Sequence, residues 1–342
     1  MALKPPVEVP QGAIRLNTDS QKLEFYAQDQ WWRMATDVPT LDGGARGIFM
    51  GGYTGGPATR YNIIEYITIP SAGNAIDFGD LSAAKLAPAG VASSRTRGLY
   101  FGGNIPSPGA DVDVIEYITI SSTGDAVDFG NMLGADRYGN AGSNQTRAVQ
   151  MGGYDGGSPF TNVMQYVTMA STGNAVDFGD LITSSGTTLN TCTSPTISVL
   201  GGFTGPSNTI EYITIHTLGN AQDFGDLTNN TNQNCGSNVS SSTRGVFFPG
   251  GPSSIDSIDY ITMASKGNAV EYGDTDGMAG GSGRANCAST IRAVTSGGGS
   301  HPAYSNQIAY IAIATGGTAV DFGDSTQATG LSGGLSNGHG GL

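Results

Sequence analysis

The chain has 342 residues, of which 38% are hydrophobic and only 13% charged, so it can build a sizeable core and differs from disordered acidic chains. Fifteen Lys and Arg against 28 Asp and Glu give a formal net charge of −13 without a basic cluster, which argues against nucleic acid and anionic membranes as partners. No apolar run is long enough for membrane insertion, and MALKPPVEVPQGAIR shows no signal peptide.

Residues 1–40 are expected to form a small β-module. Within them GAIRLNT (12–18), KLEFYA (22–27) and WWRMA (31–35) are separated by polar turns, which predicts a three-stranded meander. Three aromatic side chains of this module are expected to be exposed and to contact other chains, for example in a homo-oligomer such as a trimer. They are Phe25, Trp31 and Trp32.

From residue 45 onward, one block of about fifty residues recurs six times. Each block has a tyrosine in a stretch like IEYITI and, twelve positions later, an aromatic residue in a sequence like DFGD. The interval of twelve is constant, whereas successive tyrosines are 46 to 51 residues apart, so each block has one half of fixed length and one of variable length. The tyrosines are Tyr66, Tyr117, Tyr166, Tyr212, Tyr260 and Tyr310, and the later aromatics are Phe78, Phe129, Phe178, Phe224, Tyr272 and Phe322.

The half of fixed length predicts a β-hairpin. Its first stretch alternates β-branched and aromatic residues, a glycine occupies one fixed place in the turn, and AIDFGDL-like residues form the returning strand. In five of the six blocks Asn or Asp follows that glycine, and we interpret these as residues that tolerate positive φ. The glycines are Gly73, Gly124, Gly173, Gly219, Gly267 and Gly317.

The half of variable length predicts two more strands. A stretch of small residues such as AGVASS suits an inner strand beside a narrow channel, and the next strand ends in a glycine pair, as in RGLYFGG. Four strands at this period are typical of a β-propeller blade. The predicted fold is therefore all-β, a meander followed by a six-bladed propeller over 45–342, with blade repeats at about 45–94, 95–144, 145–194, 195–241, 242–289 and 290–342.

The two ends of the propeller sequence complement each other. The first block has no small-residue strand before Arg46, and TGLSGGLSNGH (329–339) has no partner in the last block. We expect this C-terminal segment to supply the missing inner strand of the first blade, which would close the ring without a free sheet edge.

The order of small inner strand, hydrophobic strand with Gly-Gly, E-Y strand and outer strand resembles the kelch repeat, although DFGD stands where kelch repeats usually carry Trp. The sequences of the repeats, such as IEYITI, STGNAVDFGDL and TRGVFFPGG, are similar to those of kelch-like structural proteins of tailed phages. Residues 10–36 are similar to small β-modules of phage tail fibre and other virion proteins. The resemblance implies a virion protein, made in the host cytoplasm and attached to other virion proteins through residues 1–40.

Recurrence assigns most candidate motifs to the scaffold. The DFG-like copies come without a phosphate-binding loop, so we interpret the Phe as packing between blades and the Asp as accepting turn hydrogen bonds. A recurring arginine and a recurring acidic or polar residue are interpreted as scaffold pairs across or between blades. They are Arg46, Arg97, Arg147, Arg244 and Arg292, with Glu65, Glu116, Gln165, Glu211 and Asp259.

No catalytic residue, metal site or cofactor is expected. Cys192 and Cys287 take the same place in their inner strands, and with Cys235 they are interpreted as small buried residues, since no C-x-x-C occurs. His216 and His301 fall in loops on opposite faces of the predicted propeller and so cannot converge on one metal ion.

A ligand is expected to bind where the blades differ. The segments after the glycine pairs vary most, and they should emerge on the same face as the connections to the next blade. Their aromatic rings, interleaved with Asn, Asp and Ser, suit the recognition of a glycan or a protein surface, and covering the propeller rim is the alternative role. These residues are Tyr53, Tyr61, Tyr154, Phe160, Phe203, His301 and Tyr304.

The expected function is that of a tail fibre or receptor-binding component of a virion, whose loops contact a glycan or protein of the host surface. One alternative is a capsid-decorating or adaptor virion protein that uses the propeller only as a docking block. The other is a polysaccharide-degrading enzyme, which a clustered acidic pair on the loop-bearing face would favour.

Overall fold

The computed structural model describes residues 9–17, 22–33, 45–54, 59–106, 109–156, 160–186, 190–205, 207–231, 237–250, 255–275, 283–300 and 303–342. In these ranges the chain forms strands and turns but no helix, and hence no helix that could span a membrane. The expected all-β class is thereby confirmed. The chain divides into two compact units, Met1–Leu41 and Asp42–Leu342, and each is described by itself.

The first unit is a three-stranded antiparallel sheet, which confirms the expected meander. Its strands are β1 (Ile14–Asn17), β2 (Lys22–Ala27) and β3 (Gln30–Arg33), in that spatial order. Gln28 and Asp29 form the turn between β2 and β3 with φ of 51° and 59°, the left-handed conformation that a two-residue hairpin turn requires.

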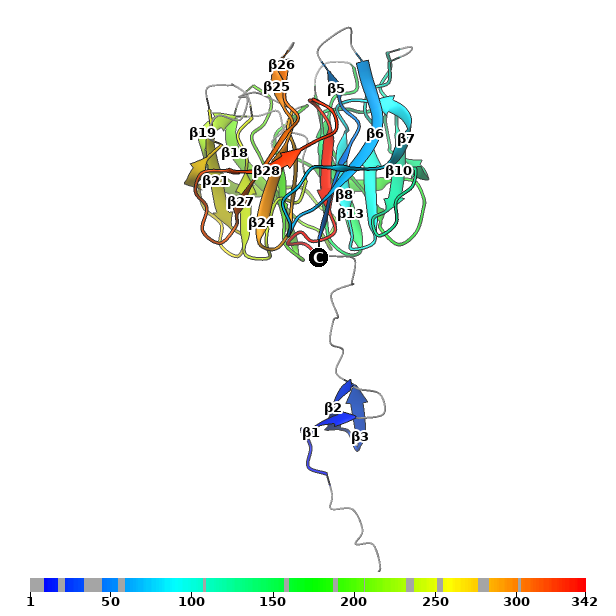
Figure 1. The fold of residues 1–342 in the computed structure, drawn as a ribbon, viewed down its shortest axis with the longest axis vertical. Coiled ribbons are helices and arrows are strands. Elements are labelled where there is room, and N and C mark those ends of the chain that lie inside the picture. The colour runs from blue at the N-terminus through cyan, green and yellow to red at the C-terminus, as the bar shows by residue number, and fades with distance from the viewer. Residues whose placement is uncertain are drawn as a thin grey trace, which may run out of the picture. The chain divides into compact units, whose positions relative to one another are not determined.

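The second unit consists of small antiparallel sheets that follow one another along the chain, one for each sequence block (Figure 1). The second sheet contains β8 (Gly90–Ser93), β9 (Arg97–Phe101), β10 (Val114–Thr119) and β11 (Val127–Asn131). The third contains β12 (Asn140–Ser143), β13 (Arg147–Gly153), β14 (Thr161–Thr168) and β15 (Val176–Asp180). The fourth contains β16 (Thr191–Thr193), β17 (Ile197–Gly201), β18 (Ser207–Thr214) and β19 (Gln222–Thr231).

The remaining sheets vary this plan. The sixth sheet contains β23 (Ala285–Ala288), β24 (Arg292–Ser296), β27 (Gln307–Ala312) and β28 (Val320–Asp324), beside a short ribbon of β25 (Gly299–Ser300) and β26 (Ala303–Tyr304). The first sheet contains β4 (Arg46–Met50), β6 (Thr59–Thr68) and β7 (Ile76–Lys85), with the short β5 (Tyr53–Thr54) on β6. Its innermost strand is β29 (Gly333–Ser336), which pairs with β4, so the pairing expected for the C-terminal segment is confirmed.

In the described residues the fifth sheet has three strands, β20 (Arg244–Phe247), β21 (Ser257–Thr262) and β22 (Val270–Asp274), and no strand at the expected inner position. The described segment before β20 makes a bridge between Ser240 and Gly245, and the N–H of Val246 donates to the carbonyl of Val239 at 2.9 Å. The extended backbone of this segment is interrupted at Asn238, which has a φ of 55°. Its fully buried side chain instead bonds the third sheet, donating to Ser143 Oγ at 2.8 Å and accepting from the Ser143 N–H at 3.1 Å.

The hairpin turn of each sheet forms backbone hydrogen bonds with the outer strand of the sheet before it. Between the first and second sheets, the N–H of Gly124 donates to the carbonyl of Phe78 and the N–H of Ala126 to that of Asp80, both at 2.8 Å. The glycine of the DFG sequence makes this approach possible, because a Cβ on Gly79 would collide with the carbonyl of Gly124. The sixth and first sheets make the same contact, with the N–H of Gly73 donating to the carbonyl of Phe322 at 2.8 Å.

The hydrophobic core lies between neighbouring sheets. One cluster combines Leu99, Phe101 and Phe129 of the second sheet with Val167 and Met169 of the third. The phenylalanine of the DFG sequence is thus packed between sheets, as predicted, and in the first block its ring lies edge-on to Tyr66 at 6.1 Å between centroids. The other clusters have a similar composition and lie at the other boundaries between neighbouring sheets, which we call seams.

The recurring arginines do not pair with the recurring acidic residues, which corrects the expectation. The guanidinium of Arg46 lies 4.8 Å from the ring centroid of Tyr66 on its own sheet and donates to the carbonyl of Ile120 in the next hairpin at 2.8 Å. The carboxylate of Glu116 instead accepts the backbone N–H of Ser82 from the previous sheet, also at 2.8 Å. Both side chains therefore join neighbouring sheets: Arg46 bonds a backbone carbonyl, and Glu116 bonds a backbone N–H and also pairs with Lys85.

The Asn or Asp after the hairpin glycine also acts between sheets. The carboxylate of Asp125 accepts the N–H of Asp80 at 3.0 Å, and Asn74 accepts that of Asp324 at 3.1 Å. None of the five has positive φ, so the interpretation as left-handed turn residues is wrong. These residues recur at one place in the repeat because each accepts a hydrogen bond from the backbone of the neighbouring outer strand. The role of hydrogen-bond acceptor that we expected of the DFG aspartate thus belongs to them.

Candidate functional site

The variable loops and the connections between sheets come together on one surface. The N–H of Gly52, at the end of a glycine pair, donates to the carbonyl of Lys85 in the connection to the second sheet at 2.8 Å. Gly103 makes the equivalent bond to Asp136 at 2.9 Å. Gly52 has a φ of 105°, which explains why this position is glycine. We call the surface formed by these two kinds of segment the loop face.

Two tyrosines from distant parts of the sequence meet on the loop face. The hydroxyl of Tyr304 donates to that of Tyr53 at 2.6 Å, and the ring centroids lie 5.1 Å apart. The backbone of Tyr53 also bonds Gly330, which fixes the loop of the first sheet beside the segment before β29. Burial, the bond to Tyr53 and the nearby hydroxyls of Tyr53 and Tyr138 raise the pKa of Tyr304, so it stays a neutral donor.

A second aromatic group is built around Arg137. Its guanidinium lies 5.3 Å from the ring centroid of Tyr138 and 5.0 Å from that of Tyr154, and it donates to the carboxylate of Asp111 at 3.2 Å. The ring of Tyr154 packs in turn against Phe160 at 5.4 Å between centroids. All these rings are half-buried. We call the combined set the aromatic strip: Tyr304, Tyr53, Tyr138, Arg137, Tyr154 and Phe160.

Sequence reasoning predicted Tyr53, Tyr154, Phe160 and Tyr304 but missed the residues between them. Arg137 and Tyr138 lie in the connection from the second to the third sheet, whereas the predicted ligand contacts all lie in the segments after the glycine pairs. The sequence held one signal that could have found them. DRYGN is the only such connection with an arginine and an aromatic residue side by side.

A group of carboxylates adjoins the aromatic strip. The side chain of Asp136 is nearly buried, and burial, reinforced by the charges of Asp155 and Asp111, raises its pKa to about 7. Asp111 is held by Asn104, which donates to its carboxylate at 2.6 Å, and by Arg137. Near neutral pH Asp136 can therefore donate or accept a proton, while Asp111 accepts hydrogen bonds from Asn104 and Arg137.

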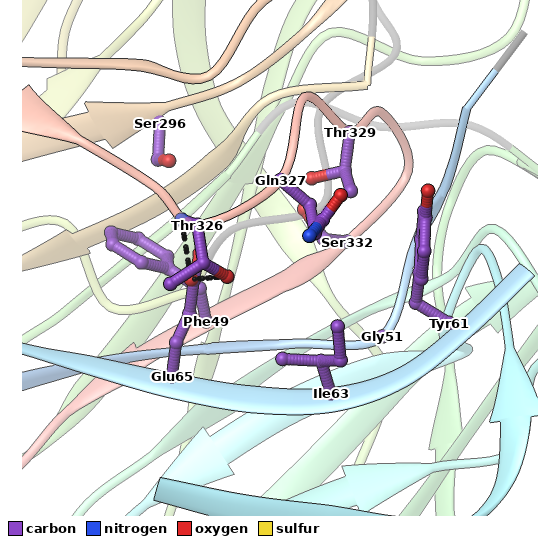
Figure 2. Close-up of a pocket in the computed structure, with 10 residues that line it drawn as sticks. All are labelled: Phe49, Gly51, Tyr61, Ile63, Glu65, Ser296, Thr326, Gln327, Thr329 and Ser332. Carbon is purple, nitrogen blue, oxygen red and sulfur yellow. Dashed lines mark hydrogen bonds between the residues drawn. The ribbon is translucent and has the colours of Figure 1, made fainter. Parts of the chain in front are cut away.

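Tyr61 lies apart from the strip, in a small hollow between the first and sixth sheets. Figure 2 shows Tyr61 and Glu65 on β6, with Thr326 and Gln327 on the facing segment. Glu65 accepts the backbone N–H of Thr326 at 2.9 Å and its hydroxyl at 2.7 Å. This bond repeats the cap that Glu116 makes at the next seam, so the floor of the hollow belongs to the scaffold.

Of the predicted ligand-contacting residues, Phe203 does not contribute to the loop face. Phe203 is fully buried and packs against Leu200 and Val149 in the core between the third and fourth sheets, so its prediction as a surface contact is wrong. His301 lies outside the described residues.

The aromatic residues predicted for the N-terminal module separate onto two sides of its sheet. Phe25 lies opposite Trp32 in the strand register, so these two share a side, and Trp32 is exposed. Trp31 lies opposite Tyr26 on the other side, where the guanidinium of Arg15 stacks on its ring at 4.0 Å. Phe25 and Trp31 are half-buried, which corrects the expectation that all three rings are exposed.

Cysteine and histidine side chains are placed as scaffold elements. Cys192 and Cys287 are fully buried, which raises the pKa of both thiols and confirms their interpretation as small core residues. His216 is exposed, with its Nε2 3.1 Å from the amide nitrogen of Asn144. Within the described ranges no three His, Cys, Asp or Glu side chains are placed to hold a metal ion. Cys235 lies outside those ranges.

A comparison with protein-family models found no match for this chain, and a comparison with curated proteins found none either. The chemistry of the site therefore rests on its own geometry. The aromatic strip offers flat apolar surfaces, and the hydroxyls of Tyr53 and Tyr304 with the carboxylates of Asp111, Asp136 and Asp155 offer hydrogen-bonding groups around them.

Proposed function

We propose that Asp42–Leu342 is a six-bladed kelch-like β-propeller in which each sheet is one blade and β29 closes the ring. Two observations support this proposal. The hairpin contact that joins each sheet to the one before it also joins the first sheet to the sixth. Arg292 of the sixth sheet likewise donates to the carbonyl of Ile69 in the first at 2.8 Å, as Arg46 does to the second.

On this scaffold the chain acts as a structural protein of a tailed-phage virion, a tail fibre or receptor-binding component whose loop face contacts the host surface. The observation that carries the proposal is the aromatic strip, which is assembled from side chains that do not recur in the blades. The scaffold contacts recur between successive pairs of sheets, whereas in the described part of the chain the strip occurs once. Loops that differ on a regular scaffold are where binding residues concentrate.

The chemistry of the loop face favours a glycan as the ligand. Aromatic rings stack on the C–H faces of sugars, and hydroxyl and carboxylate groups beside them accept and donate hydrogen bonds to sugar hydroxyls. The net charge of −13 opposes polyanionic glycans and favours neutral or amine-bearing ones. A host protein is the alternative ligand.

The test is binding of the purified full chain to host cells. Tyr53→Ala and Tyr154→Ala should each weaken binding about tenfold, since one stacked ring contributes about 1–2 kcal/mol. Leu218→Ala is the control, because Leu218 is exposed in a hairpin turn at the opposite ends of the strands. Equal binding by all three variants would contradict a role for the strip, and loss of binding after host proteins are digested would indicate a protein receptor.

Position in the particle is tested by antibody labelling of intact virions. Label at the tail tips supports the tail fibre role, and label over the shell supports the capsid-decorating alternative. Removal of residues 1–40 should leave a folded propeller that no longer joins the particle. Continued incorporation of the truncated chain would exclude attachment through this module.

One observation favours a polysaccharide-degrading enzyme as a second candidate. Asp136 has a pKa raised to about 7 and lies close to Asp155 and Asp111, the arrangement in which one carboxyl donates a proton while another is ionised. Release of reducing ends from host polysaccharide, abolished by Asp136→Asn and Asp155→Asn, would establish this activity. No release by the wild-type chain, with binding intact, would leave recognition as the function of the face.

A further inference from the structure

The strand register sorts the N-terminal sheet into an apolar side and a polar side. Ile14 lies opposite Phe25, Leu16 opposite Leu23, and Phe25 opposite Trp32. Because directly opposed residues in an antiparallel sheet point to the same side, these five side chains form one surface. We call it the apolar face: Ile14, Leu16, Leu23, Phe25 and Trp32.

The apolar face is open to solvent within the described part of the first unit. Ile14 is 63% exposed, Leu16 61%, Trp32 44% and Leu23 42%. The indole N–H of Trp32 donates to the carbonyl of Ala27 at 2.9 Å, which leaves its ring as an apolar surface without an unmet donor. Four large hydrophobic side chains exposed together on so small a sheet indicate an interface.

The opposite side of the sheet has its own contacts. Arg15 donates two hydrogen bonds to the carboxylate of Glu24, at 2.8 and 3.0 Å, and stacks on Trp31. Tyr26 packs edge-on against Trp31 at 5.3 Å between ring centroids. Arg15 and Glu24 are therefore paired within the sheet, whereas none of the side chains of the apolar face is charged.

These properties restrict which surfaces can cover the apolar face. A partner with charged groups would lose their hydration without gaining an ion pair, so the partner surface must be apolar as well. The same face of another copy meets this condition, because an uncharged apolar surface is complementary to itself under twofold or threefold symmetry. The exposed area is on the order of 500 Å² per copy, so two copies bury about 1,000 Å², which reaches the lower size of specific interfaces.

We propose that the apolar face is a self-association surface, occupied in the assembled protein by the apolar face of other copies of this chain. A three-stranded sheet of this size needs such a covering, since one open face leaves it without a core. The proposal depends on the register and exposure of the first unit, and it stands or falls separately from the function proposed for the propeller.

The first experiment measures the mass of the full chain in solution by sedimentation. Wild type should sediment as a dimer or trimer of the 34.9 kDa chain, and Leu16→Glu should give the monomer. Leu218→Glu is the matched control, because Leu218 is 59% exposed in the second unit and undergoes the same chemical change; it should stay assembled. A monomeric wild type, or an assembled Leu16→Glu variant, would overturn the proposal.

The second experiment does not depend on a destabilising charge. Leu23→Cys places a thiol on the central strand of the apolar face, and Leu218→Cys is its control; both are made with Cys235→Ser. Mild oxidation should link two chains covalently in the Leu23 variant only. If the wild type is assembled but Leu23→Cys does not cross-link, the copies meet through another surface and the proposal fails. A monomeric chain that needs the apolar face to join virions would show that a different virion protein covers it.

Discussion

Lys85 and Glu116 form an ion pair that is buried between the first and second sheets. Both side chains are almost inaccessible, at 2% and 1% exposure, and the ammonium also lies 5.7 Å from the ring centroid of Tyr100. In the third sheet Gln165 takes the place of Glu116 and bonds Gln150, its cross-strand neighbour on the same sheet. The buried ion pair is therefore particular to the first and second sheets, and it depends on both partners.

Lys85→Met is expected to lower the free energy of unfolding by about 3–5 kcal/mol, because it leaves the carboxylate of Glu116 buried without its counter-ion. The double variant Lys85→Met/Glu116→Gln should recover most of this loss, since glutamine keeps an acceptor for the N–H of Ser82. Chemical denaturation of both variants checks the prediction. A double variant as unstable as the single one would mean that the methionine fails to pack there.

His339 should make stability depend on pH. Burial lowers its pKa from 6.5 to about 4, although the nearby carbonyl of Ser93 opposes the shift. Its Nδ1 accepts the N–H of Gly341 at 3.1 Å. Between pH 6.5 and 4 the unfolded chain binds a proton that the folded chain does not, so the free energy of unfolding falls by up to about 3 kcal/mol as the pH drops. His339→Gln should remove this slope.

Asp136 contributes a slope of the opposite sign. Its folded pKa of about 7 exceeds the ordinary 3.8, so the folded chain binds the extra proton and stability rises as the pH falls from 7 toward 4. The quantity to measure is therefore the difference between wild type and His339→Gln at each pH, because Asp136 contributes equally to both. A difference that does not change with pH would show that His339 is protonated as readily in the folded chain as in the unfolded one.

At the residue scale, the sequence predicted which positions recur but not which groups their side chains contact. Arg46 and Glu65 look like partners because they have opposite charges and recur together. Each instead bonds backbone groups of a different neighbouring sheet, which no spacing along one chain reveals. Tyr53 and Tyr304 are 251 residues apart and meet only because the first and sixth sheets are adjacent.

At the scale of the element, the hairpin of fixed length was predicted best. Its alternation, its turn glycine and its constant interval come from local geometry, and the hairpins of β6–β7 and β10–β11 follow them. The inner strand of the fifth sheet was predicted, but the described residues form no strand there; Asn238 has a φ of 55° and donates a hydrogen bond to Ser143 of the third sheet. A bond to a residue 95 positions away leaves no local signal in the sequence.

Gly79→Ala tests the contact between a hairpin and the outer strand before it. The new Cβ would collide with the carbonyl of Gly124, and the φ of 150° is unfavourable for alanine, so a loss of about 2–4 kcal/mol is expected. Gly134→Ala is the control, since nothing lies within 4 Å of its Cβ position. Thermal unfolding should separate the two variants by several degrees. Equal melting temperatures would mean that the contact between hairpin and outer strand accommodates the new methyl group without loss of stability.

At the scale of the whole second unit, β29, its last strand, pairs with β4, its first strand. It pairs with β4 over Gly333–Ser336, and the N–H of Gly340 bonds the carbonyl of Ser240 at 2.8 Å. Deletion of residues 329–342 should therefore expose the inner edge of β4 and abolish cooperative unfolding. Calorimetry is the measurement, and an unchanged melting profile would contradict closure by β29.

The hairpin that covers each outer strand has a consequence for crowding. An uncovered outer strand would present a row of free N–H and C=O groups on which another molecule could add a strand, the first step of fibrous aggregation. Here the hairpin of the next sheet occupies those groups, as Gly124 and Ala126 do along β7. Even at very high local concentration, copies of this chain are therefore expected not to polymerise through the outer strands of the second unit.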